Sequence, residues 1–216
     1  MNWLQRWRGE DGPQRWIVVD VETTGLDVQH CRLLAIAAVA LRPGPQRIDV
    51  LPGDSFEVVL RPDAAAVQAG APPDKANILL HGIGVGQQDA GVDAAQALRE
   101  FDDYAAGAPR LGFHAAFDRA VLERAARLAH GSARRARWAD LADLAPVLYP
   151  GTAASALDDW LALFGIECVQ RHQAAADALA TAELLQQLWP RVVTEGAAGG
   201  FAALERLAAR RRWLAG

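Results

Sequence analysis

The amino-acid sequence predicts an α/β fold with a mixed central sheet flanked by helices, and three observations support this prediction. Three segments that are typical of strands, the first of them a β-branched run, lie within the first 60 residues and are separated by turns. After Gly91, apolar residues recur every three or four positions, which is typical of helices. Two short apolar segments interrupt these helices, as expected where parallel strands are joined through helical crossovers.

The first three strands are expected to form an antiparallel meander. They span residues 15–21, 33–41 and 54–60. The turn at 23–27 contains Gly25, which is free to adopt a positive φ. Residues 61–90 are rich in Pro, Gly and Ala and are expected to be mostly loop, with a short helix near 64–68.

The rest of the chain predicts helices alternating with short strands. The predicted helices span residues 92–107, 116–129, 140–148, 155–164 and 174–188, and the predicted strands 110–113 and 137–139. Ser155 is expected to cap its helix, Gly131 and Gly165 to follow helix ends, and Trp189-Pro190 to end the last helix of this set.

Composition and charge exclude several classes of protein. With 216 residues, 51% of them hydrophobic and 22% charged, the chain fits one folded domain. The longest apolar run, residues 33–41, is too short to span a membrane. Cys31 and Cys168 are far apart, which excludes a disulfide scaffold and a cysteine-based zinc site. The net charge of −4 argues against a protein that coats nucleic acid by charge alone. The N-terminus lacks the apolar segment of a secretory signal, so a cytoplasmic location is expected.

The chain divides into a stub at 1–14, a main domain at 15–190 and an Arg-rich helical extension at 191–216. Trp3 and Trp7 in the stub are expected to pack on the domain itself. The basic residues of the last helix are expected to form a solvated face first and a nucleic-acid contact second; they are Arg206, Arg210, Arg211 and Arg212.

Asp20 and Glu22 are the first candidate site residues. On a strand they point to the same side, at the end of an apolar segment. Two such carboxylates repel each other unless a cation lies between them. The alternative is that the strand ends at Val19 and that both acids are solvated.

Three further segments place acids or histidines at element boundaries. Asp118 falls in the first turn of a helix, where an acid interacting with the helix dipole is the simple alternative. His172 precedes a helix that has Asp177 near its start, among alanines; the alternative is an exposed histidine and an ordinary N-terminal acid. His81, before Gly82, is compatible with a surface turn.

Taken together, these segments resemble the motifs of the DEDDh class of 3′–5′ exonucleases in the ribonuclease-H-like superfamily. Within that class the chain is most similar to the epsilon proofreading subunits of bacterial DNA polymerase III. The matching segments, in the family's order, are DVETTGL (20–26), HGI (81–83), AAFD (115–118), LDDWLALFGI (157–166) and HQAAADA (172–178). The likeness covers about residues 15–190, which would make this region the exonuclease domain.

The resemblance implies a ribonuclease-H-like fold and a site with two divalent ions, Mg²⁺ or Mn²⁺. The implied metal ligands are Asp20, Glu22, Asp118 and Asp177, with His172 as the general base. Carboxylate oxygens suit these ions, and an imidazole with a pKa near 6.5 suits a base. The residues implied to line the pocket for the terminal nucleotide are Thr23, Thr24, Gly25, Leu26, His81, His114 and Phe117.

Two positions depart from the family pattern. The family usually has Asn where this chain has His114, and Glu where it has Ala35. A histidine can still donate a hydrogen bond, so activity is expected to survive that change. Ala35 removes an acid from the second strand, where the packing is expected to differ.

The sequence therefore predicts a metal-dependent 3′–5′ exonuclease that acts on single-stranded or frayed DNA ends, releases nucleoside monophosphates and serves proofreading or repair. The alternatives are an exoribonuclease on short RNA and a non-catalytic interaction module with an exonuclease fold. The expected partners are a nucleic acid 3′ end and a replication or repair protein, with no membrane. Arg134, Arg135 and Arg137 are candidates for helping to attract phosphate.

Overall fold

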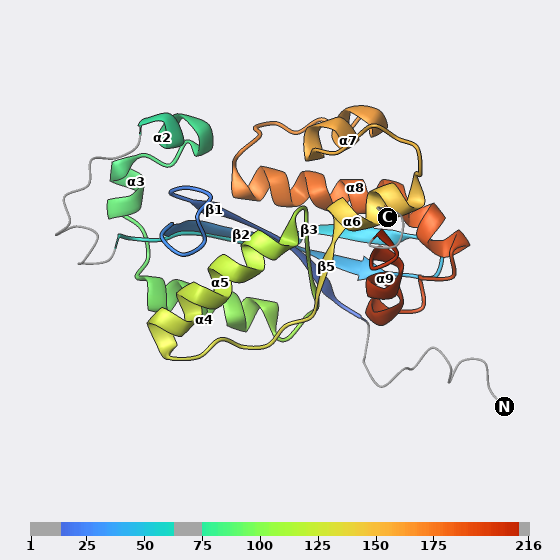
Figure 1. The fold of residues 1–216 in the computed structure, drawn as a ribbon. Coiled ribbons are helices and arrows are strands. Elements are labelled where there is room, and N and C mark those ends of the chain that lie inside the picture. The colour runs from blue at the N-terminus through green and yellow to red at the C-terminus, as the bar shows by residue number, and fades with distance from the viewer. Residues whose placement is uncertain (1–13, 63–74, 212–216) are drawn as a thin grey trace.

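The computed structural model describes residues 14–62 and 75–211, in which five strands form one mixed sheet (Figure 1). The strands are β1 (Trp16–Thr23), β2 (Leu33–Pro43), β3 (Ile48–Val59), β4 (Arg110–Gly112) and β5 (Trp138–Asp140). The helices are α2 (Lys75–His81), α3 (Val85–Asp89), α4 (Ala94–Ala105), α5 (Ala115–His130), α6 (Leu141–Leu148), α7 (Leu157–Phe164), α8 (Ala174–Thr194) and α9 (Phe201–Ala208).

The sheet has the order β3-β2-β1-β4-β5, with an antiparallel half and a parallel half. β1 pairs with β2 and β2 with β3 in antiparallel fashion, because short connections join these strands. β4 and β5 extend the sheet in parallel with β1, and each is reached through a helix. The predicted α/β fold, a three-strand meander plus parallel strands, is confirmed.

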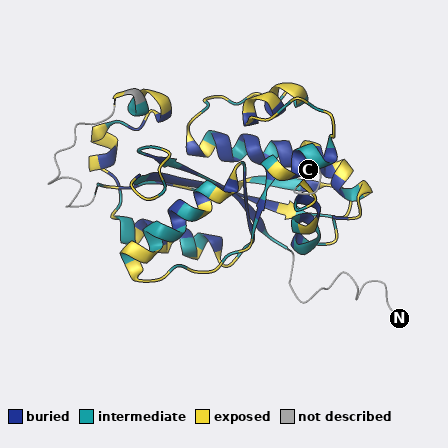
Figure 2. Ribbon diagram, viewed as in Figure 1, coloured by how far each residue is buried: buried dark blue, intermediate teal, exposed yellow. Residues whose placement is uncertain are grey.

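Helices cover both faces of the sheet (Figure 1). α8 lies on one face together with α6, α7 and α9, and α4 and α5 lie on the other. β1 divides its side chains between them: Trp16 and Val18 pack toward α8, whereas Ile17, Val19 and Val21 pack toward α4 and α5. β1, β2 and much of α8 are buried, while β3, α2, α3 and α7 carry exposed residues (Figure 2).

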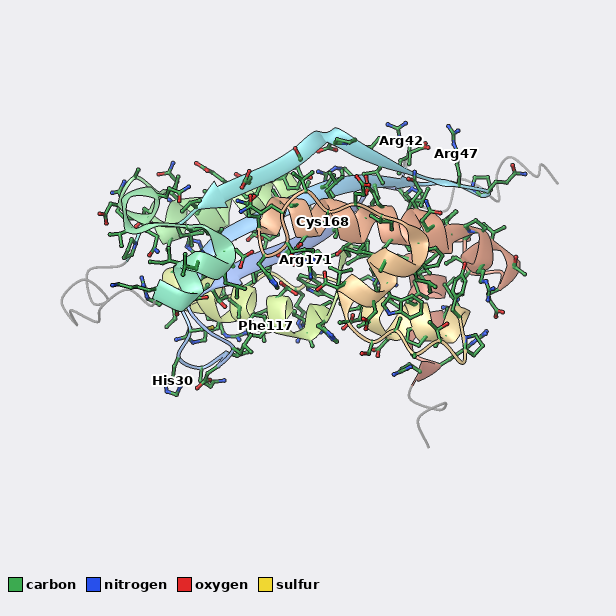
Figure 3. The ribbon with its side chains drawn as sticks, turned by 90° about the horizontal axis from the view of Figure 1, so that it is seen from above. His30, Arg42, Arg47, Phe117, Cys168 and Arg171 are labelled. Atoms are coloured by element: carbon green, nitrogen blue, oxygen red, sulfur yellow. The ribbon has the colours of Figure 1, made fainter. Side chains whose placement is uncertain are left out.

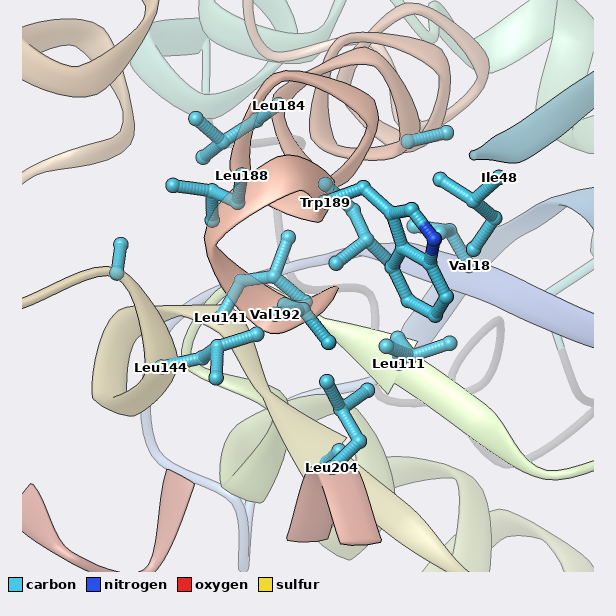
Figure 4. Close-up of a cluster of buried hydrophobic side chains, with 14 of the residues drawn as sticks. Val18, Ile48, Leu111, Leu141, Leu144, Leu184, Leu188, Trp189, Val192 and Leu204 are labelled. Carbon is cyan, nitrogen blue, oxygen red and sulfur yellow. The ribbon is translucent and has the colours of Figure 1, made fainter. Parts of the chain in front are cut away.

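The larger core lies between α8 and the sheet, and its centre is aromatic. Trp189 of α8 is fully buried among leucines and valines (Figure 4). Trp16 makes edge-to-face contacts with Trp189 and with Phe201 of α9, at ring-centroid distances of 5.7 and 5.1 Å. α9 therefore contributes to the main core through Phe201, Leu204 and Leu207.

The helix predicted to end at Trp189-Pro190 continues to Thr194, so that prediction was wrong. A proline inside a helix removes one hydrogen bond and costs about 3 kcal/mol. Trp189 and Val192, on either side of Pro190, are both fully buried, and their packing offsets that loss.

Residues 61–90 were predicted to be mostly loop, yet they contain α2 and α3. Both helices are short, and a tertiary contact holds α2 in place: the Asn77 side chain donates a hydrogen bond to the Thr23 carbonyl, 3.0 Å away. β3 also begins earlier than predicted, at Ile48, which is fully buried in the main core.

Two local features differ from the sequence prediction, and some predicted features lie outside the described residues. Ser155 does not cap α7; instead the Asp159 carboxylate accepts the backbone N–H groups of Ser155 and Ala156, each at 2.9 Å. Gly25 is not among the residues with positive φ. The predictions for residues 64–68, Trp3, Trp7 and Arg212 lie outside the described residues.

The basic residues proposed as phosphate contacts have acidic neighbours. Arg137 pairs with Glu205 at 2.5 Å, and Arg210 pairs with Glu195 at 2.8 Å. Arg206 is exposed on α9, whose opposite face packs into the core. Part of the positive charge is therefore balanced within the chain.

Candidate active site

Asp20 and Glu22 lie at the carboxyl end of β1, on the face that turns toward α8. They continue the side of the strand that carries Trp16 and Val18, as the period of a strand requires. Their partners in register on β2 are alanines, Ala37 for Asp20 and Ala35 for Glu22. The pairing then shifts between Glu22 and Thr23, so regular pairing of β1 with β2 ends at the candidate site.

Asp118 reaches the site from the first turn of α5. β4 pairs with β1 at Ile17 and Val18 and then ends, so the N–H of Val21 needs another acceptor. The Asp118 carboxylate is that acceptor, with its Oδ1 3.1 Å from the Val21 nitrogen. Asp118 is 5% exposed, so this hydrogen bond holds a buried acid beside the end of β1.

Gly112 allows α5 to start this close to the sheet. A Cβ at residue 112 would lie 3.2 Å from the Val19 carbonyl oxygen and 3.3 Å from the Ala115 Cβ. Any side chain there would press against β1 on one side and the start of α5 on the other. The glycine therefore sets the position from which Asp118 points toward β1.

Asp177 reaches the site from the first turn of α8, and it is 6% exposed. Its Oδ2 accepts the backbone N–H of His172 at 3.0 Å, and its Oδ1 accepts a hydrogen bond from the Arg171 guanidinium. Arg171 also pairs with Asp158 on α7. Arg171 and Cys168 lie near the beginning of α8 (Figure 3), and the Cys168 sulfur is 3.6 Å from Asp177 Oδ1.

Burial, and then repulsion by neighbouring acids, raises the pKa values of Asp20, Glu22 and Asp118. Burial raises the pKa of Asp20 well above its usual range, with Asp118, Asp177 and Glu22 adding to the effect. The pKa of Glu22 rises to about 8, first through burial and then through Asp177 and Asp118. The pKa of Asp118 rises to about 7, mainly through burial, with a contribution from Asp140. The four carboxylates predicted from the motifs therefore act on one another in one place.

The donor set fits a divalent cation in its chemistry, although the side chains are not yet arranged around one. Within the described part of the chain, no group of three or more His, Cys, Asp or Glu side chains is already placed to hold a metal ion. Asp177 accepts hydrogen bonds from Arg171 and His172, and Asp118 accepts one from Val21. Carboxylate oxygens suit Mg²⁺ or Mn²⁺, and a cation would relieve the repulsion between the acids.

His172 is exposed and belongs to the loop that precedes α8. Its backbone adopts a left-handed conformation with φ 62°, which lets its N–H turn back to Asp177 while the ring points away from the core. The end of α2 lies close to this loop, since a Cβ at Gly82 would be 3.6 Å from Gln173 Nε2. The backbone of His172 is therefore tied to Asp177, and the residue is open to solvent.

The residues after β1 form a loop held by its own threonines. Thr23 donates its hydroxyl hydrogen bond to the Gly25 carbonyl at 2.7 Å, and Thr24 Oγ1 accepts the N–H of Arg32 at 2.9 Å. Leu26 stands out from this loop and is 87% exposed. An apolar side chain exposed beside a cluster of acids is available to an incoming ligand.

His81 lies inside the protein, so its interpretation as a surface turn is wrong. It is 2% exposed, and its Nδ1 accepts the N–H of Ile83 at 2.9 Å. Burial lowers the pKa of the ring, which keeps the imidazole neutral. His81 therefore shapes the turn after α2 beside the candidate site.

His114 caps the start of α5 in a left-handed conformation with φ 60°, and its N–H donates to Asp140 at 2.9 Å. Asn and His are both enriched at positive φ, which explains how histidine is accommodated where the resembling family has asparagine. The ring is exposed. Phe117, in the first turn of α5, is half-buried against the core on the α4 and α5 face.

Ala35 lies opposite Glu22 and packs with Leu34 and Ile83. A glutamate there would place a further acid directly across from Glu22, where like charges repel.

Sequence reasoning missed several residues that hold the site together. Arg171 and Cys168 contact Asp177, Asp158 holds Arg171, and Asp140 anchors His114. Arg171 stands next to His172 in the sequence, and that position was the available signal. The other contacts depend on tertiary structure.

Residues 17–185 match the model of the RNase_T family, described as exonuclease. The chain belongs to this exonuclease family. It is 29% identical over 174 residues to the PolC-type DNA polymerase III of Halalkalibacterium halodurans, covering 80% of this chain and 11% of that protein. It is 28% identical over 184 residues to a DNA polymerase III subunit epsilon-like protein of Rhodobacter capsulatus, covering 84% of this chain and 24% of that protein. This exonuclease chain thus spans a quarter or less of the length of these relatives.

Solved structures show the same fold. Exonuclease I of E. coli in complex with a dA16 oligonucleotide superimposes with a TM-score of 0.65 and 19% identity, covering 84% of this chain and 42% of that one. Cell-death related nuclease 4 superimposes with a TM-score of 0.68 and 15% identity, covering 82% and 64% of the two chains. Among the described residues, no helix is both long and apolar enough to cross a membrane.

Proposed function

We propose that this exonuclease removes nucleotides one at a time from the 3′ end of single-stranded or frayed DNA and releases nucleoside monophosphates. The observation that supports this proposal best is the group of four carboxylates, Asp20, Glu22, Asp118 and Asp177, whose charges act on one another from three elements. Such a group is unfavourable for folding and is useful for holding divalent cations.

Under this proposal, Asp20, Glu22, Asp118 and Asp177 would hold two Mg²⁺ or Mn²⁺ ions. When bound, these ions would supply positive charge to the phosphate and lower the pKa of water. His172 would accept the proton of the attacking water, since its residue is exposed and its backbone N–H is hydrogen-bonded to Asp177. The hydrogen bond from Val21 to Asp118 would keep that acid oriented toward β1.

The loop after β1 would hold the terminal nucleotide. Thr23, Thr24 and Gly25 give the loop its shape through their hydrogen bonds, and exposed Leu26 would contact the base. The remaining pocket residues would act in different ways: His81 by supporting the wall from inside, and His114 and Phe117 from the start of α5.

The DNA preference and the partner rest on the polymerase relatives. PolC-type polymerases contain a segment similar to this chain within a much longer protein, and an epsilon-like protein does so as well. We therefore propose that the exonuclease works with a replication or repair protein in the cytoplasm. An RNA substrate is the alternative that the first experiment decides.

The first experiment measures degradation of matched DNA and RNA oligonucleotides, labelled at the 5′ end, with Mn²⁺ present. Stepwise shortening of the labelled DNA is expected, because removal from the 3′ end leaves the label on the shortened strand. Faster loss of RNA would replace the DNA assignment, and immediate release of a labelled mononucleotide would reverse the direction. Folded protein that leaves both substrates intact would contradict the enzymatic function.

The second experiment separates the roles of the site residues. Asp20→Asn is expected to abolish Mn²⁺ binding and turnover, whereas His172→Ala is expected to lower turnover and keep Mn²⁺ binding. Asp103→Asn, on the exposed side of α4, is the matched control and should change neither. Equal Mn²⁺ affinity in Asp20→Asn and the unsubstituted protein would contradict the ligand assignment.

A further inference from the structure

Arg171 occupies the position where a positive charge is needed in the acidic cluster. Its guanidinium donates to Asp177 Oδ1 through Nη1 and to Asp158 Oδ1 through Nε. The backbone N–H of His172 donates a hydrogen bond to the other oxygen of Asp177, Oδ2, at 3.0 Å. Both oxygens of Asp177 therefore have donors from two consecutive residues of one loop.

The charge of Arg171 acts on the whole cluster. Burial and neighbouring acids raise the pKa values of Asp20 and Glu22, and the Arg171 charge acts against that rise at both residues. Arg171 itself is partly buried, and its bonds to Asp158 and Asp177 outweigh the effect of burial and raise its pKa. The guanidinium is thus a permanent internal counter-ion for these acids.

A divalent cation and the guanidinium compete for the same carboxylate. A cation on Asp177 Oδ1 would lie within a few ångströms of the Arg171 charge, where like charges repel strongly. When a cation binds Asp177, Arg171 can still pair with its second partner, Asp158 on α7, whose side chain is 63% exposed.

We propose that Arg171 is a built-in competitor of the metal, which a divalent cation displaces from Asp177 toward Asp158 when it binds. This proposal rests on the proposed function, since it takes Asp177 as a metal ligand. Arg171 stabilises the metal-free protein and weakens metal binding, and Asp158 keeps the displaced guanidinium close to the site. Arg171 is therefore a positioning residue, and its contribution is visible without substrate.

The test is Mn²⁺ binding to the full chain, measured by calorimetry without nucleic acid, together with the melting temperature in EDTA. Arg171→Gln is expected to bind Mn²⁺ about tenfold more tightly and to melt at a lower temperature in EDTA. Asp158→Asn is expected to bind Mn²⁺ more weakly, because the displaced guanidinium loses its second partner. Arg210→Gln removes another arginine that pairs with one acid, Glu195, and should leave Mn²⁺ affinity unchanged.

The opposite effects of the two variants separate competition from a merely structural role, which would weaken binding in both. Arg171→Gln with unchanged or weaker Mn²⁺ binding would overturn the proposal, while the proposed function would stand if Asp20→Asn still loses binding. If Arg171→Gln does not fold, Arg171→Met takes its place, and unchanged or weaker Mn²⁺ binding in that variant overturns the proposal. Absence of Mn²⁺ binding in the unsubstituted protein would overturn the proposed function and this proposal together.

Discussion

The two ends of the layer between β1 and α8 use the same backbone geometry for opposite purposes. At one end, Trp16 of β1 meets Trp189 of α8 within a dry aromatic core. At the other end, Asp20 of β1 faces the first turn of α8, which carries Asp177, and the acids repel one another. The apolar end therefore stabilises a layer whose acidic end is unfavourable without a cation.

The largest expected effect is on catalysis at the acidic end. Asp20→Asn should lower turnover by about 10⁴-fold, or ~5.5 kcal/mol of barrier, because it removes the acid on which the charges of the other three converge. Initial rates on a DNA oligonucleotide with Mn²⁺ measure this loss. The fold should persist, because the apolar end stabilises the layer. Loss of the helical circular-dichroism signal in Asp20→Asn would show instead that Asp20 is needed for folding.

The next effect is on stability at the apolar end. Trp189→Ala should lower the free energy of unfolding by about 3–5 kcal/mol, because the side chain is fully buried against Trp16. Denaturant titration measures the change. Trp138→Ala, at a partly exposed position on β5, is the matched control and should cost clearly less. Similar losses in both variants would show that the aromatic core is not the stabilising end.

A smaller effect concerns pH in the absence of metal. The folded protein holds protons on Glu22 up to about pH 8 and on Asp118 up to about pH 7, whereas the unfolded chain releases them near pH 4. The folded state therefore binds more protons in this range, and its stability should fall as pH rises from 5 to 8. Each kcal/mol corresponds to about 2–4 °C in the melting temperature.

Melting curves in EDTA at several pH values test this expectation. Glu22→Gln should make the fall shallower, because one titrating group is removed. If the melting temperature of the unsubstituted protein stays level or increases over this range, the acids of the site do not destabilise the metal-free fold when they ionise.

The smallest effect comes from a compensated charge pair at the start of β1. Arg15 donates to both carboxylate oxygens of Asp54 at 2.8 Å, and this pairing lowers the pKa of Asp54 below its usual 3.8. Asp54→Asn should cost about 0.5–1 kcal/mol at neutral pH. The contribution is present above pH 4 and is lost as pH falls through the lowered pKa, opposite in sign to the acids of the site. A stability loss from Asp54→Asn that persists at pH 2 would contradict this assignment.

Much of the fold and the acids of the site could be predicted from the sequence, because they depend on the periodicity of apolar residues and on the order of the elements along the chain. Alternation along β1 predicts that Asp20 and Glu22 share a face, and the boundaries of later elements predict Asp118 and Asp177 at helix starts. Pro190 misled the prediction, since burial of its neighbours is a tertiary effect.

Contacts between side chains are harder to predict from one sequence. Arg171 was visible beside His172, yet its pairing with Asp177 and Asp158 depends on how α7 and α8 pack. The same holds for α2, which has a weak local signal and is tied to the end of β1 by Asn77. These contacts form only once the helices and strands have packed together.

Gly112 limits how this site can vary over evolution. A methyl group there would meet the Val19 carbonyl and Ala115, and the easiest relief is to move the start of α5 away from β1. Asp118 would shift with it and lengthen its hydrogen bond to Val21. Selection for nuclease activity would therefore also act on residue 112, a position that bears no functional group.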